Sequence, residues 1–286
     1  MTELTTYYQN VKRAVRQNLT LYFAAIIVLM MLTSVLLGPP FSRTVTTAGF
    51  TYRVDGWFWE KNWLMYLIIL VSGLLAVIRG GAAGVKNFKA LRNILYMDCD
   101  AKRLLRIADE GTRYVPYDIY KNQKQARNVA RRQRRQRRFF EQLYVEALLA
   151  CGQVDVADLY MKNGWRSKRN ALIYRQLSLN IQAHYAYQDK DAVRYRSIVE
   201  QGGRLLKRST ALWARLDWLE GRQEQAVERL KTTQPRVPYE QVMFAGLLSA
   251  YLREIGQVEE AREYADYVIE HGGTLALRET VMEDWT

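Results

Sequence analysis

The chain has 286 residues, of which 42 are Lys or Arg and 29 are Asp or Glu, giving a formal net charge of +13. A mean hydropathy of −0.27 excludes a transporter built from many membrane spans. Residues 139–286 hold 19 basic and 21 acidic residues, so the positive excess belongs to a patch and not to the whole protein. Cys99 and Cys151 lack metal-ligand spacing, and we expect them to be buried, reduced thiols.

Two apolar stretches near the start of the chain contain no charged residue. They are Leu19–Leu37 and Trp63–Ile78. A helix needs roughly 20 apolar residues to cross the hydrocarbon core of a bilayer, and flanking side chains can reach the headgroups. The sequence therefore predicts a transmembrane hairpin over 19–80, with spans at 19–37 and 62–79 and an outer loop at 38–61.

The distribution of Lys and Arg predicts the orientation of this hairpin. Basic residues precede the first stretch at residues 12, 13 and 16, and more of them follow the second stretch from Arg79 onward. Short basic loops favour the cytoplasmic side. We expect a multi-pass protein of the inner (plasma) membrane with both termini in the cytoplasm, the N-terminal segment being 1–18. Without Asp, Glu, Lys, Arg or His in its spans, the hairpin is expected to be an anchor.

Residues 81–138 are expected to form juxtamembrane helices that end in an arginine-rich segment. Three interpretations stay open for that segment: a solvated helix face, a contact with anionic lipid, and, with less support, a nucleic-acid contact. Its candidate lipid-binding residues are Lys121, Lys124, Arg127, Arg131, Arg132, Arg134, Arg135, Arg137 and Arg138.

A repeat of 34 or 35 residues runs through the second half of the chain. Its markers are Ala157, Ala192, Ala226 and Ala261, and the residues five positions before them are Gly152, Tyr187, Gly221 and Gly256. A glycine turn followed by a polar helix start and a small residue is typical of stacked helix pairs. The segment 138–273 resembles tetratricopeptide repeats.

This resemblance implies an all-α fold in which a TPR-like α-solenoid of about four helix pairs occupies 139–286. The expected first helices are 138–151, 173–186, 207–220 and 242–255, and the expected second helices are 154–163, 189–201, 223–232 and 258–271. An earlier unit is indicated by Asn93–Ala101, which resembles an element of TPR-like bacterial membrane proteins. There we expect Asp100 to cap a helix and Cys99 to lie in the core.

The resemblance also implies a concave surface built by the first helices. Its candidate peptide-binding residues are Gln142, Glu146, Tyr174, His184, Arg208, Arg215, Trp218 and Arg253. Three arginines in this set make the surface mildly basic, which suits an acidic peptide or a chain-terminal carboxylate.

No motif of catalysis, cofactor binding or metal binding occurs in the sequence, so we expect neither an enzyme nor a cofactor. The expected function is a membrane-anchored cytoplasmic scaffold for protein–protein interaction. The alternatives are an accessory subunit of a larger transport or envelope complex and a membrane-tethered nucleic-acid binder. The sequence does not identify the protein partner or the oligomeric state.

Overall fold

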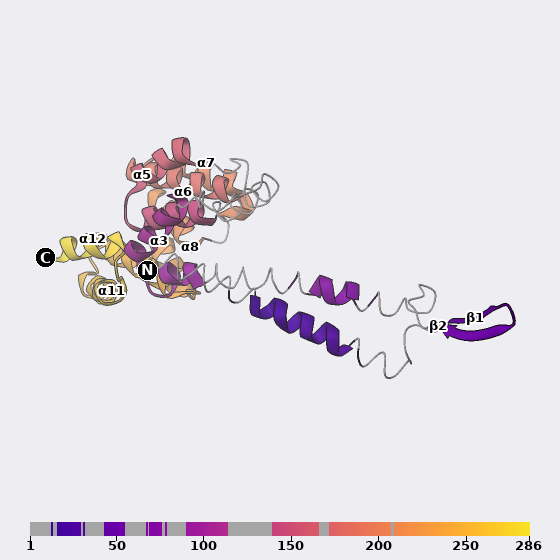
Figure 1. Ribbon diagram of the computed structural model, residues 1–286. Coiled ribbons are helices and arrows are strands. Elements are labelled where there is room, and N and C mark those ends of the chain that lie inside the picture. The colour runs from indigo at the N-terminus through magenta and orange to yellow at the C-terminus, as the bar shows by residue number, and fades with distance from the viewer. Residues whose placement is uncertain are drawn as a thin grey trace. The chain divides into compact units, whose positions relative to one another are not determined.

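The computed structural model describes residues 13, 16–29, 31, 43–54, 67, 69–75, 78, 90–113, 139–165, 172–206 and 209–286. The chain divides into two compact units, Met1–Lys89 and Ala90–Thr286, which are considered separately (Figure 1). It is mostly helical, as the repeat pattern predicts.

The first unit contains helical segments at 16–29 and 69–75, inside the two apolar stretches. Their large apolar side chains are exposed; Leu21 and Leu70 each have 68% of their surface accessible. Among the described residues, no helix is both long enough and apolar enough to span a bilayer.

A β-hairpin lies where the sequence analysis expected only a loop. Strand β1 (Arg43–Thr47) pairs with β2 (Phe50–Val54) in antiparallel register, from Arg43 opposite Val54 to Thr47 opposite Phe50. The strands are rich in β-branched and aromatic residues, which favour extended backbone. The connecting residues Ala48 and Gly49 both have positive φ, of 52° and 82°, as a two-residue hairpin turn requires.

The second unit contains the expected series of helix pairs, with helix ends within a few residues of the predicted positions. The first helices are 139–150, α6 (Leu172–Gln188), α8 (Thr210–Leu219) and α10 (Pro238–Glu254). The second helices are α5 (Val154–Leu159) with the π-helical turn η1 (Tyr160–Gly164), α7 (Ala192–Gly202) with the 3-10 turn η2 (Gly203–Leu205), α9 (Gln223–Thr232) and α11 (Val258–His271). A further helix, α12 (Ala276–Trp285), was not predicted, and it packs against α11 (Figure 1).

The second pair departs from the expected register by three residues. Lys190, with φ of 53°, takes the place in the turn that Gly152, Gly221 and Gly256 take in the other pairs. Helix α7 consequently begins at Ala192, and the fully buried Tyr195 fills the position that alanine fills elsewhere. The alignment of Ala192 with the other three alanines was therefore wrong.

The core runs continuously from pair to pair because the first helices are buried on two sides. Helix α6 contributes Leu177 and Ile181 to one apolar cluster, with the first pair, and Leu179 to the next, with α7 and α8. Helix α8 in turn contributes Leu212 to that second cluster and Ala214 to a third, with α9, α10 and α11. Stacked pairs that share helices between clusters are typical of a helical-repeat array.

Residues 90–113 belong to the same unit and join its two ends. Asp100 caps α3 (Ala101–Arg113) by accepting from the Arg103 backbone N–H at 3.1 Å, and Cys99 is buried, so both expectations are confirmed. Far along the chain, the Thr274 backbone N–H donates to the Cys99 carbonyl at 3.1 Å, and the Thr274 hydroxyl donates to the Asp100 carboxylate at 2.9 Å. The ring of Phe140, in the first pair, packs directly on Gly111.

Candidate interaction surface

Three first helices share a face of aromatic and arginine side chains. Arg215 of α8 lies 5.2 Å from the centre of the Tyr187 ring of α6. Trp218 of α8 stacks on Tyr251 of α10 with ring centroids 3.9 Å apart, and the hydroxyls of Tyr187 and Tyr251 are 3.2 Å apart. Two of the predicted peptide-binding residues, Arg215 and Trp218, are thus brought together by stacking of the pairs, and both are half-buried, Trp218 against the fully buried Tyr251.

The predicted residues of the first pair contact the segment 90–113 of the same unit. Gln142 donates to the Glu146 carboxylate at 2.7 Å, and Arg92 forms an ion pair with the same oxygen at 3.5 Å. Arg92 also lies over the Tyr96 ring, which packs edge-on against Tyr239 of α10. Burial raises the pKa of Glu146, and burial also raises that of Tyr96, to about 12.

The predicted residue Arg253 contacts the C-terminal helix. Its guanidinium donates to the Asp284 carbonyl at 2.9 Å and pairs with the Asp284 carboxylate at 3.4 Å. It also lies 5.8 Å from the centre of the Trp285 ring. The Trp285 indole N–H donates to the hydroxyl of Ser249, a buried residue one helical turn before Arg253. An acidic and an aromatic residue therefore already contact this part of the surface.

The remaining predicted peptide-binding residues are Tyr174, His184 and Arg208. Tyr174 donates to the Met161 carbonyl at 3.4 Å and packs edge-on against Trp165. His184 is half-buried; burial and then the charge of Arg215 lower its pKa, which favours the neutral imidazole. Arg208 and all nine basic residues proposed for lipid binding, from Lys121 to Arg138, lie outside the described residues.

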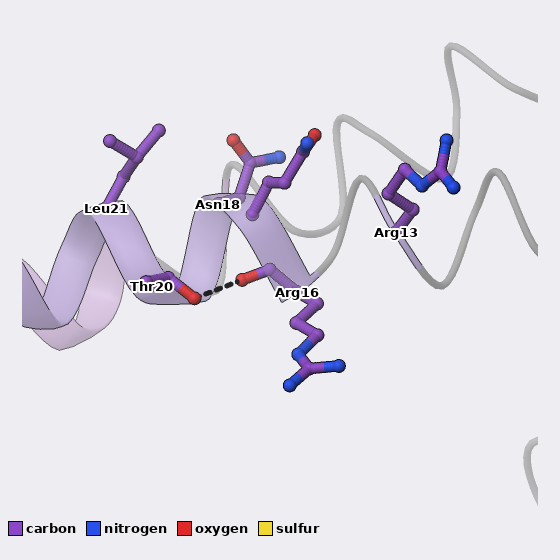
Figure 2. A pocket seen from close by; sticks show the side chains of 6 residues that line it. Arg13, Arg16, Asn18, Thr20 and Leu21 are labelled. Atoms are coloured by element: carbon purple, nitrogen blue, oxygen red, sulfur yellow. Dashed lines mark hydrogen bonds between the residues drawn. The ribbon is translucent and has the colours of Figure 1, made fainter.

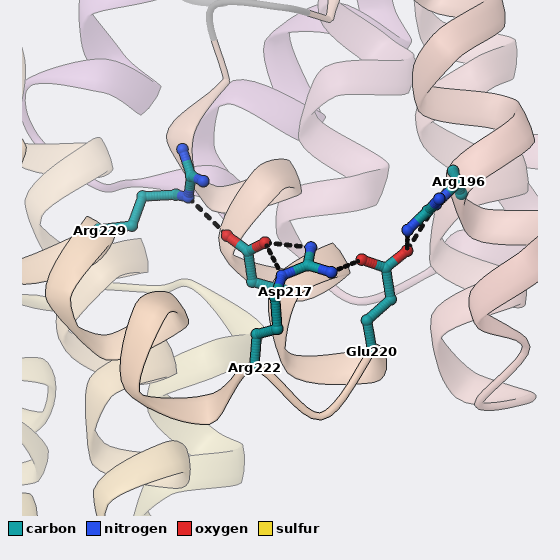
Figure 3. A network of polar contacts seen from close by, with 5 residues as sticks. All are labelled: Arg196, Asp217, Glu220, Arg222 and Arg229. Carbon is teal, nitrogen blue, oxygen red and sulfur yellow. Dashed lines mark hydrogen bonds and ion pairs between the residues drawn. The ribbon is translucent and has the colours of Figure 1, made fainter.

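A network of two acidic and three arginine side chains connects helices, and both of its carboxylates are paired. Asp217, only 3% exposed, accepts from Arg222 at 2.5 Å and 3.1 Å and from Arg229 at 2.7 Å. Glu220 pairs with Arg222 and with Arg196 of α7. Figure 3 shows each carboxylate between two guanidinium groups, an arrangement that joins α7, α8 and α9. Paired in this way, the carboxylates stabilise the packing of adjacent pairs.

Within the part of the chain that the structure describes, no group of three or more His, Cys, Asp or Glu side chains could hold a metal. In the first unit, a hollow of about 530 Å³ lies at the start of the apolar helix and is lined by Arg13, Arg16, Gln17, Asn18, Thr20 and Leu21. Figure 2 shows the Arg16 side chain directed to the side of the helix opposite Leu21.

Sequence reasoning missed the contribution of α12 to the candidate surface. The signal was present: Leu277, Val281 and Trp285 recur every four residues after the Gly272–Gly273 helix end, a spacing typical of an amphipathic helix. The role of Ser249 had no comparable signal, because it depends on the position of Trp285, a residue distant in sequence. Comparisons with protein-family models, curated proteins and solved structures found no match to this chain.

Proposed function

We propose that this protein is a membrane-anchored scaffold for protein–protein interaction and not an enzyme. Its helix pairs would form the interaction unit on the cytoplasmic side of the inner membrane, and the two apolar stretches would form the anchor. The observation that carries the proposal is the contrast between an apolar, exposed first unit and a well-packed second unit of helix pairs.

The first unit supports the anchoring part of the proposal. Its helical segments expose large apolar side chains that a folded water-soluble surface seldom groups together. Those in the segment 16–29 are Leu19, Leu21, Phe23, Ile27, Val28 and Leu29. Arg13 and Arg16 stand at the start of that segment, where basic side chains interact favourably with lipid headgroups on the cytoplasmic side.

The second unit supports the binding part of the proposal. The half-buried side chains of Arg215, Trp218 and Tyr187 lie together on the first helices, and the buried Tyr251 holds Trp218 in place by stacking on it. Arginine, tryptophan and tyrosine are the residue types that most often dominate binding energy at protein interfaces. The basic residues Lys121–Arg138, which precede the first helix pair in sequence, would bind anionic lipid in the same proposal, and contact with nucleic acid is the less favoured alternative.

A second candidate function is an accessory subunit of a larger membrane complex, in which the apolar hairpin is the contact surface. The exposed apolar segments of the first unit favour it, because helices in a membrane also associate with other helices. Cross-linking of intact membranes followed by mass spectrometry separates the two functions. Partners attached through 139–273 support the scaffold, and partners attached only through 20–80 support the subunit and contradict the scaffold.

A further inference from the structure

Helix α12 packs its apolar face against the other helices, as a bound helical peptide would. Its apolar residues Leu277, Val281 and Trp285 follow one face; Leu277 packs on Gly246 of α10, and Trp285 packs beside the apolar cluster of α8–α11. A Cβ atom on Gly246 would lie 2.6 Å from the Leu277 side chain, so α10 has no room there for a larger residue. The surface of α10 at Gly246 therefore fits the Leu277 side chain of α12 closely.

The charged residues that meet across this contact have opposite signs. Asp284 of α12 pairs with Arg253 of α10, and Glu279 of α12 pairs with Lys102 of α3 at 2.8 Å. In both pairs the acidic residue belongs to α12 and the basic residue to the surface that receives it. An acidic helix with an aromatic residue next to a carboxylate is therefore complementary in charge to this surface.

Helix α12 has fewer buried residues than the helices beneath it, so its packing is weaker. Of its ten residues only Val281 is buried, and the side chains of the Arg253–Asp284 and Lys102–Glu279 pairs are substantially exposed. Helix α10, by contrast, has nine buried residues and packs along α11. An exposed terminal element with few buried residues opens at lower free-energy cost than the core of its domain.

We propose that α12 is a displaceable internal ligand of the surface formed by Gly246, Ser249 and Arg253. The external partner of this surface is an acidic amphipathic helical peptide in which an aromatic residue follows a carboxylate, as Trp285 follows Asp284. Such a peptide binds where α12 leaves, so α12 limits access of partners to the scaffold. This inference rests on the proposed scaffold function and specifies its partner.

A competition experiment tests the proposal on the full chain in detergent micelles. The probe is a fluorescently labelled synthetic peptide with the sequence of residues 274–286, and the readout is fluorescence anisotropy. The protein variant Asp284→Asn/Trp285→Ala weakens the internal contact only. We expect it to bind the peptide at least about tenfold more tightly than the wild-type protein does, because apparent affinity scales with the fraction of open surface.

Two matched controls define the site. Adding Arg253→Ala to that variant is expected to weaken peptide binding about tenfold, the loss of roughly one hydrogen-bonded charge contact. A peptide with Asn and Ala at the positions that match Asp284 and Trp285 is expected not to bind. Equal binding by wild-type and variant protein, binding insensitive to Arg253, or no saturable binding to the folded variant overturns the proposal. None of these outcomes bears on whether 139–273 cross-links to partners in membranes.

Native-state hydrogen exchange of the wild-type chain gives an independent test that needs no variant. We expect the amides of α12 to exchange through an opening that leaves those of α10 protected. Exchange of α12 only together with α10 would mean that the helix is an inseparable part of the core, and the proposal would be wrong.

Discussion

At the scale of single residues, the turn before α7 carries a conformational cost that the other helix pairs avoid. Lys190 has φ of 53°, whereas the equivalent residues of the other three turns are glycines. A side chain in the left-handed region costs about 1–2 kcal/mol, a cost that glycine does not incur. We therefore expect Lys190→Gly to raise the free energy of unfolding by about 1 kcal/mol, measured by thermal or denaturant unfolding.

The interior of the preceding helix provides the control for this substitution. Gln176→Gly places glycine at an exposed position inside α6, where it is expected to destabilise by about 0.5–1 kcal/mol. If both substitutions shift stability in the same direction, the turn does not carry the inferred cost.

Glu146 is expected to give the stability of the second unit a characteristic pH dependence. Burial raises its pKa, so the folded protein holds this proton more tightly than the unfolded chain does. The associated stability is present below the ordinary Glu pKa of about 4.3 and is lost as pH rises through the higher folded value. Glu146→Gln removes this titration, so its stability relative to wild type should increase as pH rises from 4 to 7.

Glu279 is the opposite case and serves as the control for Glu146. The hydrogen bond from Lys102 lowers its pKa, so its contribution is present above the ordinary Glu pKa and is lost as pH falls. Glu279→Gln should therefore not reproduce the trend of Glu146→Gln. A Glu146→Gln variant whose stability parallels wild type across this range would contradict the assigned burial.

The role of a residue could be predicted from the sequence where its partners are close in sequence, and could not where its partners are distant. Asp100 precedes an apolar pattern, so its capping role followed from sequence. Lys190 carries no sequence signal for a left-handed backbone, because glycine is the residue that normally marks one. The contacts of Arg92 with Glu146 and of Arg253 with Asp284 join residues far apart in sequence, which no spacing encodes.

At the scale of elements, the tight crossing of α9 with its neighbours depends on a small residue. Ala226 is fully buried within the cluster formed by α8–α11. We expect Ala226→Leu to lower the free energy of unfolding by about 1–3 kcal/mol, because added methyl groups have no space there. The exposed Gln225 of the same helix is the control, and Gln225→Leu should change stability by less than about 0.5 kcal/mol. Equal melting midpoints for the two variants would contradict the observed packing.

The helix pairs were predictable as elements because turn glycines and buried alanines recur with a regular period. Three of the four turns follow that pattern, and the ends of α9 and α11 match their predicted bounds. The second pair was misplaced because Tyr195, a large residue, fills the position expected for alanine. The β-hairpin was missed because its extended pattern lies between two strongly apolar stretches, where only a loop was considered.

At the scale of the whole molecule, residues outside the helix pairs form contacts that connect the two ends of the second unit. Thr274 bonds to Cys99 and Asp100, and Glu279 pairs with Lys102, so α3 meets the segment that follows α11. Contacts of such long sequence separation are a property of the folded array and are absent from any local window. They are also the reason that residues 90–113 group with the helix pairs.

Anchoring by the two apolar stretches is tested most directly by the behaviour of the full chain in cell membranes. Membranes are washed with alkaline carbonate, and intact cells are treated separately with protease, followed by immunodetection of the C-terminal part. We expect the chain to stay in the carbonate-washed pellet and its C-terminal part to survive protease until the cells are lysed. Release of the chain into the carbonate supernatant, or loss of the C-terminal part from intact cells, would contradict this expectation.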